Sequence, residues 1–286
     1  MKIKVTAMHV DSHGSGAPLL LIHGWGMHGG MWGAVTEQLA QYFHVLAVDL
    51  PGHGLSAGSG EWRVGSREWK VGGSHLVSHS PIPTSHLLLD SIVDQLSAQF
   101  SEPLTVCGWS LGGQVALHWA AREPEKIKRL VLVTSTPCFA ERDDWPFGMA
   151  RATLQQFAAE LEKDYAATLR RFLALQVRGS EGERELLASL RALLFSRGEP
   201  HPDALREGLE ILRDADLRST LPGIKQPALV IAGERDKLTP PQASYYLAQR
   251  LPNARLVEIK GAAHAPFLSH PKIFIQHLKS FLNERV

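Results

Sequence analysis

The stretch 104-LTVCGWSLGGQVALHWAA-121 passes from an apolar segment typical of a buried strand, through a glycine-flanked serine, into a segment typical of a helix. It contains the pattern Gly-x-Ser-x-Gly, with Ser110 between Gly108 and Gly112. Small residues at both glycine positions permit a sharp turn, which lifts the serine hydroxyl above the carboxyl end of the strand. Glycine-rich turns are common, so the pattern alone leaves a structural turn and a nucleophile about equally open.

Further short apolar runs, bounded by Gly, Pro or Asp, are also typical of buried strands. Most are continuously hydrophobic, as in a parallel sheet covered on both faces. Helical periodicity lies between them, and this alternation predicts an α/β fold with right-handed crossovers. We therefore predict a mostly parallel central sheet with helices on both faces. The predicted strands are 18–22, 44–50, 104–109, 129–135, 227–233 and 254–259, and the predicted helices include 31–43, 85–100 and 114–123.

The alternation of strands and helices stops between residues 137 and 222. The segments 150–179 and 183–195 in this region are helical in character, and glycines interrupt them. We predict that 137–222 is a helical cap, or lid, inserted between two strands of the sheet. The core of the fold would then consist of residues 1–136 and 223–286.

Residues 57–84 form an unusual stretch within the predicted core. The stretch is rich in Gly and Ser, and it contains a short internal repeat, in which 61-EWRVGS-66 resembles 68-EWKVGGS-74. We predict a loop excursion on the surface, because a structureless segment of this length is rarely part of a compact core. A partner-binding or gating role stays open, because Trp62 and Trp69 are costly to expose to water.

Composition and charge exclude several classes of protein. The hydrophobic content is 44%, the charged content is 21% and the formal net charge is +1, so no charge bias predicts binding to nucleic acid or to a membrane surface. The two cysteines, Cys107 and Cys138, form neither a disulfide framework nor a zinc motif, which fits a reducing compartment. No signal peptide or spanning segment is apparent, so we predict a cytoplasmic protein.

A nucleophilic serine needs a base and an acid that orients the base. Asp236 lies in 233-GERDKLTPP-241 and His264 in 259-IKGAAHAPFLSHP-271, each directly after a predicted strand. Taken alone, the aspartate could cap a turn and the histidine could be a packed loop residue. Together with Ser110 they follow the chain order of the α/β-hydrolase triad, so we predict these three as the catalytic residues.

An oxyanion hole is the remaining part of such a site. One expected donor is the backbone N–H of Leu111, which follows the serine. The other should come from a loop after an early strand, and 22-IHGWGMHGGMW-32 has the required His-Gly-x-Gly pattern, with Trp25 as the donor. We expect His23 to bond within this loop and His28 to lie at the surface.

The triad order, the His-Gly-x-Gly loop and 49-DLPGHGLS-56 together resemble the α/β-hydrolase superfamily over nearly the whole chain. Within it, the sequence is similar to the pimeloyl-acyl-carrier-protein methyl ester esterases of biotin synthesis. The 57–84 stretch departs from that family, because it is much longer than expected. The segments that carry the resemblance are 22-IHGWG-26, 107-CGWSLGGQVAL-117, 135-STPCFAERDDWP-146, 171-RFLALQ-176, 208-GLEILRDADLR-218 and 261-GAAHAPFLSHP-271.

The resemblance implies a serine carboxylesterase that hydrolyses the methyl ester of pimeloyl-acyl-carrier protein to the free carboxylate and methanol. The implied partner is the acyl-carrier protein, the chain is expected to be a monomer, and neither a metal nor an organic cofactor is expected. Three alternatives stay open. They are a general short-chain carboxylesterase, another α/β-hydrolase chemistry such as a carbon–carbon bond hydrolase or a menaquinone-pathway lyase, and a non-catalytic receptor or scaffold, which the intact triad disfavours.

The resemblance also places 171-RFLALQ-176 against the bound acyl chain. Its apolar residues could equally be the packed face of an amphipathic helix. Trp109, beside the nucleophile, could form a wall of the ester pocket or pack beneath it. The implied substrate-binding residues are Trp25, Ser110, Leu111, Phe172, Leu173, Ala174, Leu175, Gln176 and His264.

An acyl-carrier protein is acidic, so a basic docking face is expected. Residues 150–200 contain seven Arg and one Lys against seven Asp and Glu, so net charge alone does not predict docking. Three basic pairs, Lys163/Arg170, Arg171/Arg178 and Arg184/Arg191, are each seven residues apart, which places each pair on one face of a continuous helix. Solvated faces of mixed charge remain the alternative. With the resemblance, the predicted docking residues are Arg170, Arg171, Arg184 and Arg191.

Overall fold

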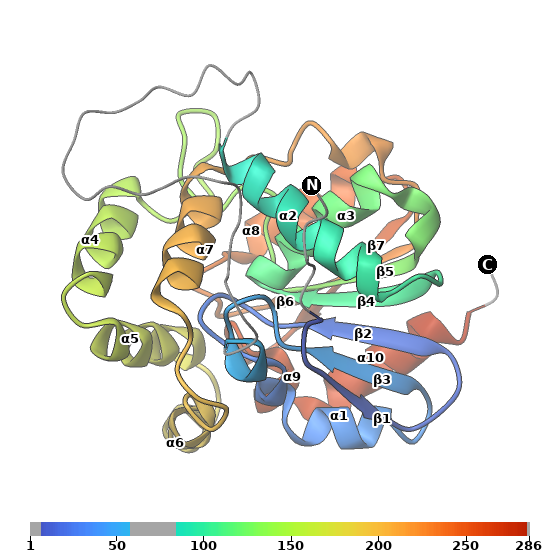
Figure 1. Ribbon diagram of the computed structural model, residues 1–286. Helices are drawn as coiled ribbons and strands as arrows, with labels where there is room; N and C mark the ends of the chain where they lie inside the picture. Colours follow the sequence, from blue (N-terminus) through green and yellow to red (C-terminus); the bar gives the residue numbers. More distant parts are fainter. Residues whose placement is uncertain (1–6, 58–83, 285–286) are drawn as a thin grey trace, which may run out of the picture.

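The computed structural model describes residues 7–57 and 84–284. A seven-stranded sheet with the order β1-β3-β2-β4-β5-β6-β7 forms its centre (Figure 1). Strand β1 runs antiparallel to β3, and all other neighbours are parallel. The predicted fold class is confirmed. The strands are β1 (Val10–His13), β2 (Pro18–Ile22), β3 (His44–Val48), β4 (Leu104–Trp109), β5 (Ile127–Val133), β6 (Ala228–Gly233) and β7 (Ala254–Ile259).

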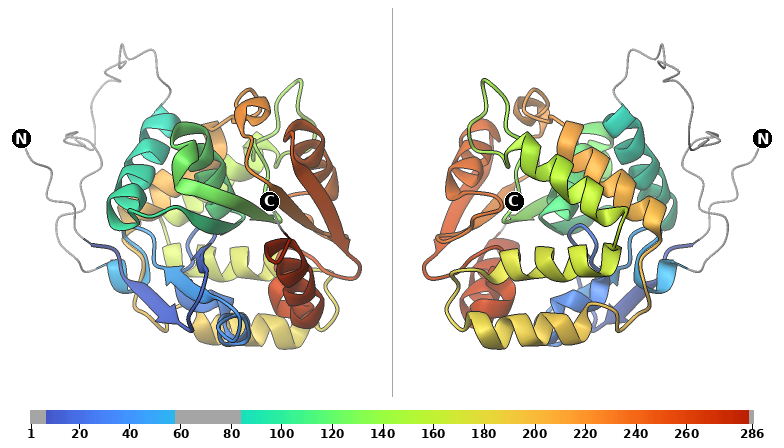
Figure 2. Two further views of the ribbon diagram at one scale, coloured as in Figure 1. Left: turned by 90° about the vertical axis from the view of Figure 1, so that its right-hand side faces the viewer. Right: turned by 90° about the vertical axis from the view of Figure 1, so that its left-hand side faces the viewer.

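Helices cover both faces of the sheet (Figure 2). Helices α2, α3 and α8 lie on one face, and α1 and α10 pack together on the other. This two-sided cover explains why the strands are continuously apolar. The helices that flank the sheet are α1 (Ala34–Leu39), α2 (Thr84–Gln99), α3 (Leu111–Arg122), α8 (Pro241–Arg250), the short α9 (Pro266–Ser269) and α10 (Pro271–Leu282).

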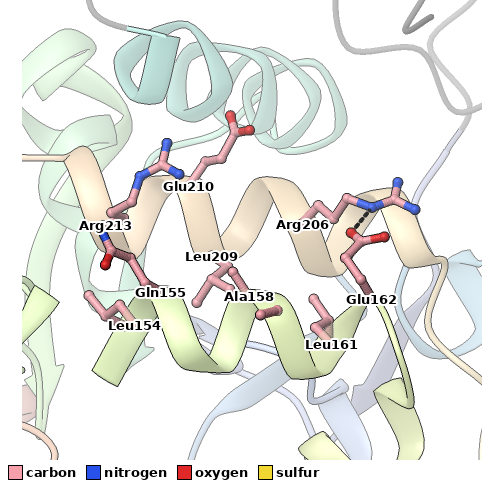
Figure 3. Close-up of a pocket in the computed structure, with 10 residues that line it drawn as sticks. Leu154, Gln155, Ala158, Leu161, Glu162, Arg206, Leu209, Glu210 and Arg213 are labelled. Atoms are coloured by element: carbon pink, nitrogen blue, oxygen red, sulfur yellow. Dashed lines mark hydrogen bonds and ion pairs between the residues drawn. The ribbon is translucent and has the colours of Figure 1, made fainter. Parts of the chain in front are cut away.

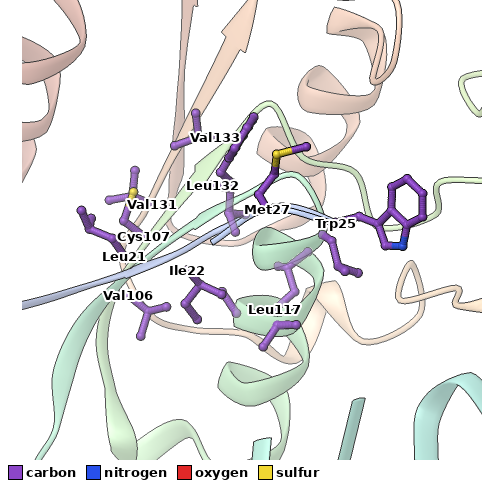
Figure 4. Packing of buried hydrophobic residues seen from close by; sticks show 14 of the residues in the cluster. Leu21, Ile22, Trp25, Met27, Val106, Cys107, Leu117, Val131, Leu132 and Val133 are labelled. Carbon is purple, nitrogen blue, oxygen red and sulfur yellow. The ribbon is translucent and has the colours of Figure 1, made fainter. Parts of the chain in front are cut away.

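The centre of the core lies where β2, β4 and β5 meet (Figure 4). Every residue of β4 is buried, and Ile22, Val106 and Leu132 are completely inaccessible to solvent. Burial of such a side chain contributes about 1.5–3 kcal/mol to folding. Trp25 lies at the edge of this packed group, beyond the end of β2 (Figure 4). The core therefore gives the carboxyl ends of these strands a rigid base.

Four helices separate β5 from β6 along the chain and lie together beside the sheet (Figure 1). The two ends of this segment are tied to each other. Cys138 and Asp216 form an antiparallel bridge, and the Leu217 N–H donates to the Pro137 carbonyl at 2.8 Å. We call these the inserted helices: α4 (Arg151–Leu161), α5 (Tyr165–Val177), α6 (Glu183–Leu193) and α7 (Pro202–Asp214).

Three local features differ from the prediction. Strand β1 was not predicted. The predicted helix 31–43 is shorter: a 3-10 turn at Gly29–Trp32 precedes α1, and Gly33 between them has a φ of 55°, which breaks the helix. The predicted segment 150–179 is divided into α4 and α5, because the Asp164 side chain accepts the N–H of Ala167 and starts a new helix.

Most of the predicted loop excursion at 57–84, including Trp62 and Trp69, lies outside the described residues. Among the helices that the structure does describe, none has the length and apolar character that crossing a bilayer requires.

Candidate active site

Ser110 lies in a sharp turn between β4 and α3, with φ 55° and ψ −117°. Such a positive φ is uncommon for a residue other than glycine. The flanking glycines are required by close backbone approach. A Cβ at Gly108 would lie 2.2 Å from the Gly112 carbonyl oxygen, and a Cβ at Gly112 would lie 2.4 Å from that of Ile22. The two small residues therefore permit the turn that presents Ser110.

Asp236 follows β6 and His264 follows β7, and their side chains form a buried pair. His264 Nδ1 lies 2.8 Å from Asp236 Oδ2. The other carboxylate oxygen, Oδ1, accepts the N–H groups of Leu238 at 2.8 Å and Thr239 at 3.1 Å. The His264 and Asp236 side chains are 1% and 0% exposed. The carboxylate thus orients the imidazole through Nδ1 and leaves Nε2 available as a base.

His264 Nε2 is buried and has no hydrogen-bond partner among the described residues. No hydrogen bond joins it to the Ser110 hydroxyl in this part of the chain; in free enzymes such bonds are often long and tighten when substrate binds. Trp109 connects the two regions, because its indole N–H donates to the His264 carbonyl at 2.8 Å. Trp109 is fully buried, so it packs beneath the site.

The two predicted oxyanion donors come from two segments that approach each other at Ser110. Neither the Trp25 nor the Leu111 backbone N–H donates a hydrogen bond to a described residue. Leu111 is the first residue of α3, where N–H groups lack intrahelical partners and favour negative charge. Gly24 brings the other loop close, because a Cβ there would lie 3.3 Å from Ser110 Cβ. The Trp25 indole N–H donates to the Leu205 carbonyl of α7 at 2.8 Å.

The two histidines of this loop are both buried. The Leu50 N–H donates to His23 Nε2 at 2.9 Å, and His23 Nδ1 donates to the Gly24 carbonyl at 2.8 Å. Burial lowers the pKa of His23 well below its usual value, so the side chain is uncharged and joins two loops through its hydrogen bonds. The surface position predicted for His28 is wrong: this residue is 2% exposed, and its Nε2 bonds the Leu193 carbonyl of α6 at 2.9 Å.

Helix α5 contacts the site through two residues one turn apart. The ring of Phe172 lies edge-on to the Trp25 ring, with 4.9 Å between centroids. The Gln176 carbonyl accepts the His264 N–H at 2.9 Å, and the side-chain Oε1 of Gln176 is buried without a partner among the described residues. Of the other predicted channel residues, Leu173 is buried in the core, and Ala174 and Leu175 are half-buried.

The sequence analysis missed two threonines that contact the predicted pair. The Thr239 hydroxyl donates to Asp236 Oδ2 at 2.7 Å, and the Thr134 hydroxyl donates to the His264 carbonyl at 2.7 Å. The spacing of Asp236 and Thr239 is a possible signal, because an aspartate often accepts backbone N–H groups two and three residues ahead in a turn. Nothing in the local sequence marks Thr134.

The predicted docking arginines are all exposed. Lys163 precedes α5 and Arg178 follows it. The predicted seven-residue spacing therefore holds within one helix only for Arg184 and Arg191, both on α6. These two arginines form no ion pair with a described residue.

The two arginines on α5 are engaged locally. The Arg171 guanidinium pairs with Glu160 and lies 4.6 Å from the centre of the Phe157 ring. The Arg170 guanidinium lies 5.6 Å from the centre of the Phe195 ring. Such contacts hold a guanidinium in place while leaving part of its charge at the surface.

A separate pocket of about 350 Å³ lies between α4 and α7 (Figure 3). None of the predicted catalytic residues lines it, and the ion pair between Arg206 and Glu162 lies at one end. Within residues 7–57 and 84–284, no three His, Cys, Asp or Glu side chains form a group that could hold a metal ion. The pocket is lined by Leu154, Gln155, Ala158, Ala159, Leu161, Glu162, Arg206, Leu209, Glu210 and Arg213.

Comparison with solved structures supports the fold. The esterase EaEST from Exiguobacterium antarcticum superposes with a TM-score of 0.78 at 21% identity, covering 97% of this chain and 96% of the esterase. A bromoperoxidase from Bacillus anthracis superposes with a TM-score of 0.77 at 22% identity, covering 97% and 95% of the two chains. At this level of identity the likeness concerns the fold alone.

Comparison with known sequences shows relatives of much higher identity over nearly the whole chain. The pimeloyl-[acyl-carrier protein] methyl ester esterase of Nitrosomonas europaea is 42% identical over 95% of this chain and 98% of its own length. That of Chromobacterium violaceum is 40% identical over 96% and 98%. Residues 17–271 match the family described as alpha/beta hydrolase fold. The chain therefore belongs to the alpha/beta hydrolase family.

Proposed function

We propose that the chain is a serine carboxylesterase that hydrolyses the methyl ester of pimeloyl-acyl-carrier protein to pimeloyl-acyl-carrier protein and methanol, in biotin synthesis. The observation that carries the proposal is the buried His264–Asp236 pair at the sheet edge that also presents Ser110. The full-length similarity to relatives that bear this name supports the substrate. Cys107 and Cys138 are free and form no disulfide, which supports the predicted cytoplasmic location.

The proposed reaction begins when His264 Nε2 takes the proton of the Ser110 hydroxyl as Oγ attacks the ester carbonyl. Asp236 holds the Nδ1–H and stabilises the imidazolium. The N–H groups of Trp25 and Leu111 bind the oxyanion, and the loss of one such donor typically costs about 10²–10³ in rate. The imidazolium then protonates the departing methoxide, and methanol leaves. Water, deprotonated by His264, hydrolyses the acyl-enzyme and releases the carboxylate.

We further propose that residues 137–222 act as a cap over the ester site, on a core of 1–136 and 223–286. Two contacts support this division: α7 accepts the Trp25 indole N–H, and α5 places Phe172 edge-on to the same ring. The proposal assigns Phe172 to the wall of the acyl channel. It assigns the Gln176 Oε1, which has no partner among the described residues, to a hydrogen-bond donor of the substrate. Channel roles for Leu173, Ala174 and Leu175 stay predictions.

For the carrier protein we propose docking on the exposed face of α5 and α6, through Arg170, Arg171, Arg184 and Arg191. Arg184 and Arg191 are the better test, because neither has an ion-pair partner among the described residues. Reversing both charges to Glu should lower kcat/KM on the carrier-bound ester by about tenfold, because steering by exposed charge acts mainly on association.

The double reversal should spare a small soluble methyl ester, which does not need the docking face. A matched control reverses Lys128 and Lys272, which are exposed and lie outside the inserted helices. An equal loss on both substrates would contradict docking at α6, as would an equal effect of the control pair.

The decisive assay for the substrate compares kcat/KM on pimeloyl-carrier methyl ester with kcat/KM on a free methyl ester of similar length. The proposal predicts a clear preference for the carrier-bound ester. A general carboxylesterase would hydrolyse the free ester at least as well. Labelling of Ser110 by a fluorophosphonate separates an enzyme from a non-catalytic receptor on the same fold, because the receptor would not be labelled.

A further inference from the structure

Two buried threonines, Thr134 and Thr239, connect the predicted catalytic pair to the sheet. Thr134 directly follows β5, and Thr239 lies in the turn between β6 and α8. Thr239 lies in the stretch 233-GERDKLTPP-241 that contains Asp236, but the sequence analysis predicted no role in the site for either threonine. Both are almost completely inaccessible to solvent, so their polar atoms must find partners inside the protein.

Thr134 has a strained backbone. Its φ is 41°, which is an outlier for a β-branched residue. A strained residue persists only where its surroundings hold it, and here three segments do so. Its N–H donates to the Ile231 carbonyl of β6 at 2.7 Å, its hydroxyl donates to the His264 carbonyl at 2.7 Å, and its carbonyl accepts the Thr239 hydroxyl at 3.0 Å.

The peptide groups of His264 are held from both sides. The carbonyl accepts two donors, the Thr134 hydroxyl at 2.7 Å and the Trp109 indole N–H at 2.8 Å. The N–H donates to the Gln176 carbonyl at 2.9 Å. A carbonyl oxygen has two lone pairs, so both are used. The backbone from which the imidazole projects is therefore fixed by β4, β5 and α5 together.

The Thr239 hydroxyl lies beside the bond between His264 and Asp236. Its Oγ1 is 2.7 Å from Asp236 Oδ2, 3.0 Å from the Thr134 carbonyl oxygen and 3.3 Å from His264 Nδ1. A hydroxyl has one proton, so it can donate fully to only one of the two acceptors at a time. Its oxygen keeps two lone pairs and can accept the Nδ1–H, which thereby has a second acceptor next to the carboxylate.

We propose that Thr239 and Thr134 are positioning residues for the catalytic pair. Thr239 fixes the Asp236 carboxylate and the plane of the imidazole through its hydroxyl, and Thr134 fixes the backbone of His264. Thr239 acts at Nδ1 and Thr134 at the backbone carbonyl of His264, so they govern how Nε2 meets the Ser110 hydroxyl without touching the substrate. The inference rests on the proposed esterase function, since it assigns these residues to the same site.

The test removes the hydroxyl and keeps the shape of the side chain. Thr239→Val should lower kcat on a small methyl ester by about 10–100-fold, as expected for a displaced catalytic group, and leave KM nearly unchanged. Thr239→Ser keeps the hydroxyl and should stay within about threefold of the wild type. Thr134→Val and Thr134→Ser should follow the same order. The far-downfield proton resonance of the His264 Nδ1–H should shift in Thr239→Val and return in Thr239→Ser.

A matched control is Thr220→Val, which removes a hydroxyl bond to the Leu217 carbonyl away from the site and should leave kcat unchanged. The rate of Ser110 labelling by a fluorophosphonate should fall with kcat. If carrier-bound ester is not a substrate, the proposed function fails, yet the labelling rates still compare the threonine variants. Folded Thr239→Val with normal labelling, or Thr239→Ser as impaired as Thr239→Val, would overturn the assignment. If Thr239→Val does not fold, the comparison of Thr134→Val with Thr134→Ser, together with Thr239→Ser, tests the assignment by the same criteria.

Discussion

Gly208 on α7 offers a quantitative test of how the inserted helices support the oxyanion loop. A Cβ added there would lie 2.6 Å from Cδ1 and 3.1 Å from Nε1 of Trp25. The indole cannot tilt away freely, because its N–H bonds Leu205 in the same helix and Phe172 lies edge-on to it. Gly208→Ala should gain about 1 kcal/mol in helix propensity but lose about 1–3 kcal/mol to overpacking, plus about 1 kcal/mol if the indole bond breaks.

The expected result is a net loss of stability of about 0–2 kcal/mol, or about 1–3 kcal/mol if the indole bond breaks. We also expect kcat to fall about 10–100-fold, because the backbone N–H of Trp25 moves with its side chain. Thermal unfolding and kcat on a small methyl ester measure the two effects. Gly223→Ala is the matched control, since nothing lies within 4 Å of a Cβ at that position. A Gly208→Ala variant with normal kcat and raised stability would refute the reasoning.

Further predictions concern charge. Burial, together with the nearby carboxylates of Glu210 and Asp203, raises the pKa of Glu207 from 4.5 to about 8. Between these pH values the folded state keeps a proton that the unfolded state has lost, so the free energy of unfolding falls as the pH rises. From about pH 5 to pH 8, urea unfolding should show the stability of Glu207→Gln rising by about 1–3 kcal/mol relative to the wild type, a range reduced for the partial exposure of the side chain. A stability difference between the two proteins that does not change with pH would contradict this. Burial lowers the pKa of His53 to about 4, so the unfolded state binds the extra proton and stability should fall from about pH 6.5 to about pH 4, less steeply in His53→Gln; equal slopes would refute it. Arg197→Met should lower the free energy of unfolding in urea by about 3–5 kcal/mol, because it leaves the fully buried Asp49 carboxylate without its cation. An unchanged free energy of unfolding would show that this ion pair does not stabilise the fold.

Much of the fold could be predicted because its signals are local. The strands that form the centre of the sheet are continuously apolar, and the Ser110 turn has its own glycines. Strand β1 could not be predicted, because its four residues include Asp11 and His13, and its pairing with β3 at the sheet edge is a tertiary feature. The break in helix 31–43 depends on one glycine at positive φ.

The predicted site depends partly on contacts that no local pattern contains. Ser110, Asp236 and His264 were predicted as catalytic residues because each lies in the turn or loop after a strand, and the ends of parallel strands share one sheet edge. Thr134 meets the His264 carbonyl across 130 residues of chain. His28 is buried because α6 covers it, and the loop sequence alone gives no indication of that helix. Long-range packing therefore decides the supporting contacts of the site.

The most direct test of the central claim uses the carrier-bound ester with the wild type and Ser110→Ala. Intact-mass measurement should show the wild type converting pimeloyl-carrier methyl ester to the free acid, with methanol released and a transient acyl group on Ser110. Ser110→Ala should give no product above the buffer rate. Conversion by Ser110→Ala at the wild-type rate, or no conversion by the wild type, would contradict the account.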